Sequence, residues 1–371
     1  MSITLKTAKK KVIVSVTNDL VSDNRVHKVC TTLLSMDFDV MLLGRKLPHS
    51  LPVSRDYSTK RMRLIFKKGP CFYTEFNFRL FLYLLFAKCD ILLSNDLDSL
   101  AGNFIAAKLR NKPLVYDSHE YFTEVPELIH RPKIQKIWQG LESRMLPKVK
   151  HAYTVCQSIA DVYNKQYGTN FKVVRNLPQK RDFKPVEKQS GEKIILYQGA
   201  LNIGRGLEQA IKAMHFLEDS KLVIAGDGDI RQQLHDLVEQ EKLQNKVEFT
   251  GRLPLEELSK ITTTADLGLS IEEDLGLNYR FALPNKLFDY IQAQVPVLVT
   301  NLPEMAAIVK QYTIGEITDS LDPKILAEKI QEALTSTAKR KLWKENLKSA
   351  SKELVWENEE KVIQEIFSKL L

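Results

Sequence analysis

The residues best suited to bind phosphate stand in the second half of the chain. Gly199, Gly204 and Gly206 lie close together, with Arg205 between the last two. Glycine lets the backbone come close to a ligand, and the free N–H groups at the start of a helix attract anions. The Arg205 guanidinium could donate two hydrogen bonds to one phosphate. The segment therefore indicates a phosphate-binding turn, with an ordinary strand-to-helix turn as the alternative.

A second glycine pair, Gly226 and Gly228, follows an apolar run of the strand type. The backbone here could pass beneath a bound nucleotide, because neither residue has a side chain. The alternative is a plain helix start with Asp227 and Asp229 near its first turn, where the helix dipole favours acidic groups.

A basic residue stands where another helix is expected to begin. Pro284 fits the first turn of a helix, and Asn285 and Lys286 follow it. Lys286 opposes the positive end of the helix dipole, which is easier to explain if an anion binds there. Asp289, about one turn further, could reach ribose hydroxyls. An ordinary surface helix is the alternative.

The candidates for contact with a reacting hydroxyl lie in the first half of the chain. Asp117, His119 and Glu120 come at the end of a strand-like apolar run. Three titratable groups within four residues are unusual for a loop without a role. We take His119 as the group nearest the hydroxyl, with capping and hydrogen bonding as the alternative. Arg25 and Lys28, soon after the first predicted strand, could face the same site.

Metal and disulfide chemistry have little support in the sequence. Asp96 and Asp98, like Asp227 and Asp229, are spaced as in metal-bridging Asp-x-Asp pairs. Each pair lies where a helix N-cap is expected, so we expect no metal. The four cysteines are scattered without a Cys-x-x-Cys pair. This pattern indicates neither a zinc site nor a disulfide framework and fits a reducing cytosol.

The elements expected to position these residues alternate between strands and amphipathic helices. Strand-like apolar runs cover residues 12–17, 39–43, 91–94, 114–117, 151–155, 194–198, 221–225, 246–250, 265–270 and 296–300. Such alternation predicts parallel sheets with right-handed crossovers. The polar segment 177–191 carries two prolines and is expected to be a linker.

We therefore predict an α/β protein with two Rossmann-like, doubly wound domains that face each other across a cleft. Residues 1–180 would form the first domain, and 190–350 the second. Residues 351–371 would form a helix that packs back on the first domain. Ligands of such sheets bind beyond the carboxyl ends of the strands. The aromatic stretch 71–86 could lie on a membrane, but its spacing fits a buried helix better.

The charge is unevenly divided along the chain. Residues 1–185 hold 31 Lys and Arg against 16 Asp and Glu, whereas the remainder holds 23 against 30. The net charges are therefore +15 and −7. A basic first half indicates an anionic partner, such as a lipid surface or an acidic acceptor, with plain solubility as the alternative. Nucleic acid is not expected, because no RNA-binding signature occurs.

Taken in order, these segments resemble a glycosyltransferase of the GT-B fold, in the large retaining family 4 of cytoplasmic sugar transferases. The resemblance covers nearly the whole chain and is strongest in the second half. It is carried by Gly199, Arg205, Gly206, Leu207, Gly226, Gly228, Gly251, Gly268, Pro284, Asn285, Lys286, Asp289, Pro296, Pro303 and Glu304. In the first half, Asp23, Arg25 and Lys28 resemble the family's opening segment, and Asn176 its interdomain Asn.

The resemblance implies that an acceptor hydroxyl attacks the anomeric carbon of a nucleoside-diphosphate sugar with retention of configuration. Arg205 and Lys286 would stabilise the leaving diphosphate, with no obligatory metal or other cofactor. Gly251 and Arg252 would line the nucleobase pocket. Asp289 falls where the family often has a Glu for the ribose.

The chain departs from the family pattern at two places. The family often has two Glu separated by seven residues, and Phe281 stands where the first would be. An upstream acid, Glu272, Glu273 or Asp274, could take its place. Ala200 stands where a second basic residue often follows the first glycine of the donor loop, and Lys286 could replace that residue.

The implied donor is a UDP- or GDP-sugar, and the implied acceptor is a glycan or lipid-linked glycan of surface polysaccharide synthesis. The basic first half fits a cytoplasmic protein attached peripherally to an anionic inner membrane face. The alternatives are a nucleotide-sugar epimerase or a phosphorylase on the same scaffold, or a non-catalytic protein that binds nucleotide sugars.

Overall fold

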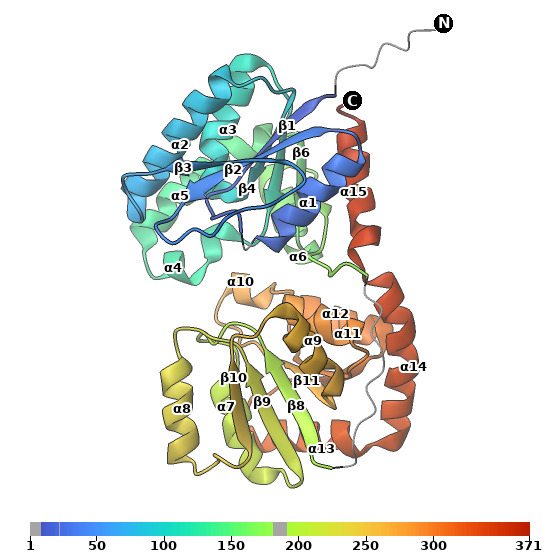
Figure 1. The fold of residues 1–371 in the computed structure, drawn as a ribbon. Coiled ribbons are helices and arrows are strands. Elements are labelled where there is room, and N and C mark those ends of the chain that lie inside the picture. The colour runs from blue at the N-terminus through green and yellow to red at the C-terminus, as the bar shows by residue number, and fades with distance from the viewer. Residues whose placement is uncertain (1–8, 22, 181–190) are drawn as a thin grey trace, which may run out of the picture. The chain divides into compact units, whose positions relative to one another are not determined.

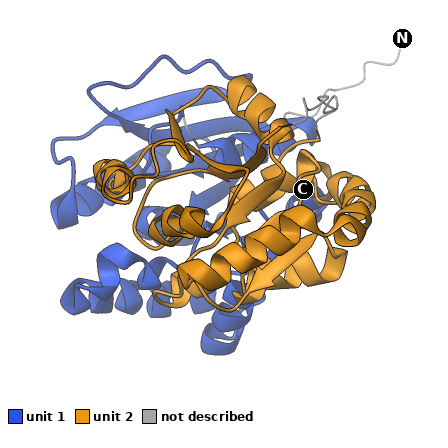
Figure 2. Cartoon of the chain, turned by 90° about the horizontal axis from the view of Figure 1, so that it is seen from below, with its two compact units in different colours: residues 1–176, 359–371 blue, residues 177–358 orange. Residues whose placement is uncertain are grey.

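The computed structural model describes residues 9–21, 23–180 and 191–371. The chain forms two compact units, residues 1–176 with 359–371 and residues 177–358, which Figure 2 colours separately. The predicted linker, 177–191, lies largely outside the described residues. Its first residues belong to unit 2, where the Trp356 N–H donates to the Pro178 carbonyl oxygen at 2.8 Å.

Unit 1 contains a parallel sheet of seven strands in the order β3-β2-β1-β4-β5-β6-β7 (Figure 1). Its strands are β1 (Lys11–Ser15), β2 (Asp39–Lys46), β3 (Ser58–Arg63), β4 (Ile91–Asn95), β5 (Leu114–Ser118), β6 (His151–Thr154) and β7 (Lys172–Val173). Its helices are α1 (Asn24–Ser35), α2 (Gly69–Phe86), α3 (Asp96–Arg110), η1 (Phe122–Glu124), α4 (Pro126–Ile129), α5 (Pro132–Met145), η2 (Leu146–Lys148) and α6 (Gln157–Tyr167).

Unit 2 contains a parallel sheet of six strands in the order β10-β9-β8-β11-β12-β13. Its strands are β8 (Lys193–Gln198), β9 (Ser220–Ala225), β10 (Val247–Gly251), β11 (Leu267–Ser270), β12 (Val297–Thr300) and β13 (Gly315–Thr318). Its helices are α7 (Leu207–Ala213), η3 (Met214–Phe216), α8 (Arg231–Gln240), α9 (Leu255–Thr264), α10 (Leu277–Arg280), α11 (Asn285–Gln292), α12 (Pro303–Tyr312), α13 (Pro323–Thr335) and α14 (Thr337–Glu353).

Strand β8 shows why these apolar runs form buried parallel strands. Ile195 and Tyr197 belong to the core that contains α7, α8 and α13, whereas Leu196 belongs to the core of α11, α12 and α14. Successive side chains of a strand point to opposite faces, so a sheet covered on both faces needs apolar residues in succession. The two predicted doubly wound sheets are thus confirmed.

The strand order fixes where a ligand should bind in each unit. The order reverses direction between β1 and β4 in unit 1, and between β8 and β11 in unit 2. In such sheets the crevice for a ligand opens beyond the carboxyl ends of the strands at this switch point. The predicted site residues lie at or after the carboxyl ends of β1 and β5 in unit 1, and of β8, β9, β10 and β11 in unit 2.

The end of the chain differs in detail from the predicted helix over 351–371. Residue 351 lies inside α14, and a second helix, α15 (Trp356–Ser368), follows a short break. From Glu359 onward the chain belongs to unit 1. There Phe367 packs edge-on against Phe38 with ring centroids 5.8 Å apart, and the Thr32 hydroxyl donates to Glu360 at 2.8 Å.

Helix α2 contains the whole aromatic stretch 71–86 that was predicted to be a buried helix, but only one of its faces is buried. Phe72, Phe76, Leu80 and Leu84 pack with α3 and the sheet. The opposite face exposes Phe78 and Phe86, among others. No helix in the described part of the chain is long and apolar enough to cross a membrane.

Candidate active site

A buried ion cluster lies at the carboxyl edge of the unit 2 sheet. Lys286 Nζ is 2.7 Å from Glu272 Oε1, and Arg205 Nη1 is 3.6 Å from the same oxygen. The Glu272 side chain is fully buried, the Lys286 side chain is 7% exposed, and that of Arg205 is 28% exposed. The structure therefore brings the two predicted cations together. Since they surround one carboxylate, the three groups carry a net positive charge that suits an anion.

Neighbouring groups hold this carboxylate in place and keep it ionised. The Ser270 hydroxyl donates to Glu272 Oε2 at 2.9 Å, and the Thr300 hydroxyl donates to the Glu272 carbonyl oxygen at 2.8 Å. Burial alone would raise the pKa of Glu272, but Lys286, Arg205 and the Ser270 hydroxyl outweigh it and lower the pKa. The Glu272 carboxylate is therefore ionised at neutral pH.

Three consecutive acids, Glu272, Glu273 and Asp274, could replace the family's first Glu. In the structure they have different partners. Glu272 enters the cluster, whereas the Glu273 N–H donates to the Gly204 carbonyl oxygen at 2.9 Å. Asp274 pairs with Arg280 at 2.8 Å. Glu272 is therefore the member of the three candidate acids that belongs to the cluster. It stands two residues after the end of β11, and this short distance from the sheet edge favours it over the other two acids.

Four of the predicted donor glycines are required by contacts within the protein. A Cβ atom on Gly226 would lie 1.8 Å from the Gly199 carbonyl oxygen, and one on Gly228 would lie 2.4 Å from the Leu201 carbonyl oxygen. A Cβ on Gly206 would lie 2.3 Å from the Ile271 carbonyl oxygen. Gly204 faces side chains instead, since a Cβ there would lie 2.6 Å from Leu275 Cδ1 and 2.8 Å from Tyr279 Cε1. These glycines let the loops after β8, β9 and β11 pack together, so their presence needs no bound nucleotide.

The other two predicted glycines are open on the side where a side chain would stand. Gly251 has φ +68° and no atom within 4 Å of its Cβ position, and Gly199 has φ +136° with only the Tyr197 hydroxyl oxygen within 4 Å of its Cβ position. The Gly226 N–H donates to the Gly251 carbonyl oxygen at 3.0 Å, which joins the ends of β9 and β10. Arg252, next along the chain, is exposed.

Helix α11 presents Lys286 from its first turn. It begins at Asn285, so Pro284 is the N-cap residue and lies just before the helix rather than inside its first turn. The Pro284 ψ of 142° is extended, which excludes it from the helix. Asp289 Oδ2 accepts a hydrogen bond from Gln198 Nε2 at 3.0 Å. This bond places Asp289 beside the end of β8.

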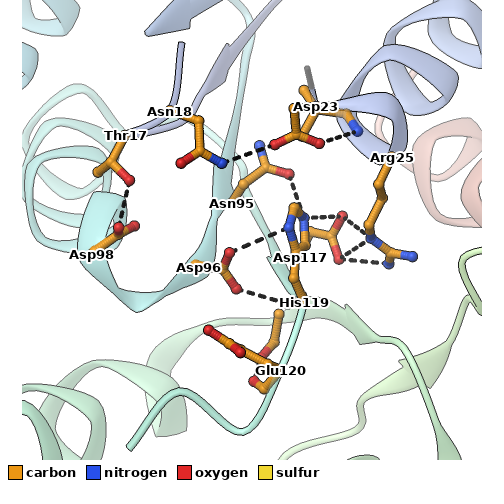
Figure 3. A network of polar contacts seen from close by, with 12 residues as sticks. Thr17, Asn18, Asp23, Arg25, Asn95, Asp96, Asp98, Asp117, His119 and Glu120 are labelled. Atoms are coloured by element: carbon orange, nitrogen blue, oxygen red, sulfur yellow. Dashed lines mark hydrogen bonds and ion pairs between the residues drawn. The ribbon is translucent and has the colours of Figure 1, made fainter. Parts of the chain in front are cut away.

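In unit 1 the predicted acceptor residues form one polar network (Figure 3). Arg25 on α1 binds Asp117 through two nitrogens, with Nη2 2.7 Å from Oδ1 and Nε 3.0 Å from Oδ2. Its Nη1 donates to the Val174 carbonyl oxygen at 2.8 Å. Lys28, one turn along α1, donates to Asn176 Oδ1 at 2.8 Å. Both basic residues thus hold α1 and the strand ends together, and Arg25 is 4% exposed.

His119 lies between two carboxylates of this network. Its Nδ1 is 3.3 Å from Asp96 Oδ2, and its Nε2 is 3.2 Å from Asp117 Oδ2 and from Asn95 Oδ1. Burial would lower the pKa of His119, but Asp96 and Asp117 outweigh it and raise the pKa to about 10. The ring is therefore a cation at neutral pH and donates from both nitrogens. It can orient or polarise a ligand, but it has no lone pair with which to accept a proton.

Neither Asp96 nor Asp98 is the N-cap residue that the sequence predicts here. Asn95 is the N-cap of α3, and Asp96 has a left-handed φ of +55° that turns its carboxylate toward His119. Asp98 accepts a hydrogen bond from the Thr17 hydroxyl. Burial, with smaller effects of Glu120, raises the pKa of Asp96 to about 7 and that of Asp98 to about 6.

Glu120 lies at the edge of the same network, where its backbone carbonyl oxygen accepts from the Ser118 hydroxyl at 2.8 Å. Among the described residues, no group of three His, Cys, Asp or Glu side chains has an arrangement that could hold a metal ion. The chemistry that these residues offer is hydrogen bonding and charge stabilisation.

Two family profiles divide the chain between them. Residues 178–350 match the family "Glycosyl transferases group 1", and residues 23–177 match "Glycosyltransferase Family 4". An uncharacterised glycosyltransferase of Methanocaldococcus jannaschii is 28% identical over 204 residues, which are 53% of this chain. The match spans half the length of that relative.

Solved structures show the same fold over nearly the full length. A sucrose-phosphate synthase from Thermosynechococcus elongatus has a TM-score of 0.81 at 17% identity, covering 98% of this chain and 99% of that one. The Anabaena protein HepE in complex with UDP-glucose has a TM-score of 0.74 at 14% identity, covering 97% and 99%. The two sheets, the paired profiles and these neighbours agree, and the chain belongs to the group 1, family 4 glycosyltransferases of the GT-B fold.

Proposed function

We propose that this chain transfers a sugar from a nucleoside-diphosphate sugar to a hydroxyl group of a glycan or lipid-linked acceptor, with retention of configuration. The observation that carries the proposal is the convergence of Arg205 and Lys286 on Glu272 at the carboxyl edge of the unit 2 sheet. An excess positive charge at this edge suits a diphosphate.

The cluster would act on the charge that develops as the donor reacts. The acceptor oxygen forms a bond to the anomeric carbon, while the bond from that carbon to the diphosphate oxygen breaks on the same face. The hydroxyl proton passes to the departing diphosphate. Because the leaving group gains negative charge, the cations of Arg205 and Lys286 stabilise the transition state more than the ground state. No metal is needed for this step.

The donor half of the proposal assigns the open glycines to the nucleotide. Gly251 and Arg252 would line the nucleobase, Gly199 would lie against the diphosphate, and Asp289 would bind the ribose hydroxyls. The structure of the Anabaena neighbour holds UDP-glucose, which supports a UDP-sugar as the first donor to try. A GDP-sugar is the second.

The acceptor half rests on the network around His119. The two N–H groups of the protonated ring face Asp96 and Asp117, so the ring would act on the acceptor through its positive charge. Arg25 would hold Asp117 in place, and Glu120 would contact the acceptor at the edge of the network. A cationic His119 makes this residue a positioning group rather than a general base.

We also propose that unit 1 attaches to an anionic membrane surface on the cytoplasmic side. Helices α2 and α3 expose Phe78, Phe86 and Leu109, which are 60%, 82% and 65% exposed, and the neighbouring Lys88 and Lys108 are exposed as well. Apolar side chains beside lysines favour binding at the surface of an anionic bilayer. Flotation with neutral and anionic vesicles tests this, and equal binding to both would contradict it.

A donor screen tests the main proposal. Thermal unfolding of the full chain is followed with UDP-, GDP-, ADP- and CMP-sugars, since a ligand raises the unfolding temperature of the state that binds it. The sugar that stabilises the chain is then incubated with and without glycan acceptors. Turnover that requires an acceptor supports transfer. Epimerisation without an acceptor would indicate the epimerase, phosphate-dependent cleavage the phosphorylase, and binding without turnover the non-catalytic protein.

A further inference from the structure

A basic pocket lies in unit 1, at the same sheet edge as the His119 network. It is formed where β2 and β3 end, and its volume is about 320 Å³, within the range of small-molecule sites. Four of its lining residues are cations and two are aromatic: Arg45, Lys46, Arg63, Lys67, Phe66 and Phe72. Strand β1 separates β2 from β4, so the pocket and the His119 network share the carboxyl edge of one sheet.

No carboxylate lines the part of this pocket that the structure describes. Arg45 lies over the Phe72 ring, with Cζ 4.8 Å from the ring centroid, and its Nε is buried without a hydrogen-bond partner among the described residues. A nearby acid, Glu75 on α2, accepts hydrogen bonds from the N–H groups of Ile65 and Phe66 and pairs with Arg79. Arg45 Nη1 donates to the Lys67 carbonyl oxygen at 3.4 Å, and Arg45 also acts on the Asp98 carboxyl by lowering its pKa against the larger effect of burial. The four lining cations together give the pocket an excess of positive charge that favours an anion.

The rim of the pocket adds apolar surface. Ile65 and Phe66, in the loop that follows β3, are 74% and 48% exposed. Exposed side chains of this size next to a basic pocket suit a ligand that joins a charged group to an apolar chain. Arginine and lysine recognise phosphate through charge-assisted hydrogen bonds.

We infer that this pocket binds the phosphate groups of a lipid-linked acceptor, while Ile65 and Phe66 contact the first part of its apolar chain. This inference rests on the proposed transfer reaction and specifies its acceptor. The sugar attached to the phosphate would then extend along the sheet edge toward His119. The reacting hydroxyl and the anchoring phosphate would be recognised by neighbouring parts of one unit.

The test is a calorimetric titration of the full chain, saturated with UDP, with farnesyl diphosphate as the probe. We expect Arg63→Ser combined with Lys67→Ser to weaken binding about tenfold or more, because two charge-assisted contacts are lost. The matched control, Lys133→Ser with Lys136→Ser, removes two exposed lysines of α5 and should bind as the wild type does. Both pairs of positions are exposed, and thermal unfolding checks that each variant folds.

Two further arms identify the source of the phosphate. Inorganic pyrophosphate should bind at least about tenfold more weakly than the farnesyl probe, since it cannot contact the apolar rim. Equal affinity would overturn the lipid-linked assignment. In flotation with phosphatidylglycerol vesicles, the Arg63 and Lys67 variant should bind as the wild type does. Loss of vesicle binding with unchanged farnesyl diphosphate affinity would assign the pocket to the membrane surface instead.

A last arm separates this inference from the proposed donor site. Arg205→Ala combined with Lys286→Ala should retain farnesyl diphosphate binding, because those residues belong to unit 2. Loss of the probe in that variant, or unchanged affinity in the Arg63 and Lys67 variant, would reject the pocket. Failure of the wild type to bind UDP would reject the donor proposal but leave the probe titration intact.

Discussion

The two units carry charged clusters at equivalent places in their sheets, but the two clusters differ in sign and in response to pH. In unit 2, Arg205 and Lys286 surround the single carboxylate of Glu272, whose pKa is lowered. In unit 1, Arg25 and His119 are set among Asp117, Asp96, Asp98 and Glu120. The first cluster has excess positive charge, and the second has excess acid.

This difference in charge indicates that the two units bind different parts of the substrates. Two cations around one carboxylate suit a diphosphate leaving group. The pKa values of Asp96 and Asp98, about 7 and 6, let these acids change charge near neutral pH. Under the proposed function, this change would alter the hydrogen bonds offered to an acceptor hydroxyl. Under the proposed function, the same sheet topology would present an anion site in one unit and a hydroxyl site in the other.

The largest effect is expected when the unit 2 cations are removed. Arg205→Ala and Lys286→Ala should each lower the rate of transfer about tenfold or more, and the double variant about 100-fold or more, because developing charge on the diphosphate loses its partners. Steady-state kinetics with the identified donor measures this. Lys260→Ala on α9 removes an exposed lysine of the same unit and is the control. Wild-type rates in the folded double variant would contradict the proposed role of these cations in transfer.

Removing the Glu272 carboxylate instead should destabilise the folded chain and strengthen the binding of anions to the cluster. Glu272→Gln leaves two cations without their buried counter-ion, and we expect a loss of about 2–4 kcal/mol in the free energy of unfolding. Added UDP should restore more stability to this variant than to the wild type, since a diphosphate can take the place of the lost charge. Thermal unfolding with and without UDP measures both. Equal stabilisation by UDP in the two proteins would show that the cluster does not meet the diphosphate.

The pH dependence should come from unit 1. Transfer should decline as the pH falls below about 7, because Asp96 and Asp98 take up protons near pH 7 and 6 as a coupled pair. Asp98→Asn should lower the rate about tenfold and move the acidic limb to lower pH, since Asp96 then titrates without a neighbouring negative charge. Rate profiles from pH 5 to 8 test this. Asp161→Asn, exposed on α6, should keep the wild-type profile.

The smallest effect is expected at an open glycine. Gly251→Ala and Gly168→Ala both place a Cβ at positive φ with no atom within 4 Å. Each should lower the free energy of unfolding by about 1–2 kcal/mol. Only Gly251→Ala should also weaken UDP binding, because Gly168 ends α6 in unit 1. Unchanged UDP affinity in the Gly251 variant would remove this glycine from the nucleotide site.

Several features could be predicted because they depend on neighbours in the sequence. Apolar runs in the sequence predicted the buried strands, such as β1, β4 and β8, because a parallel strand is covered on both faces. The polar edge strand β3 (Ser58–Arg63) has no such pattern, so its sequence does not predict a strand. The joint placement of Arg205 and Lys286 followed from two helix starts at the carboxyl edge of one sheet.

Other features required the fold. The sequence does not distinguish between three consecutive acids, Glu272, Glu273 and Asp274. In the structure only Glu272 of these three enters the ion cluster. The direction in which a side chain points depends on the turn that carries it, and this turn is fixed by contacts with a distant loop. The same applies to Gly226, whose missing side chain makes room for Gly199.

The sequence by itself determined the fold class, the division into two α/β sheets and the excess positive charge of the first half, because periodicity and charge are local properties. Only the tertiary structure decided which charges meet. Ion pairs such as Lys286 with Glu272, or His119 with Asp96, join residues whose approach depends on how separate strands and helices pack. Their pKa values follow from that approach and from burial, since both arise only when the chain has folded.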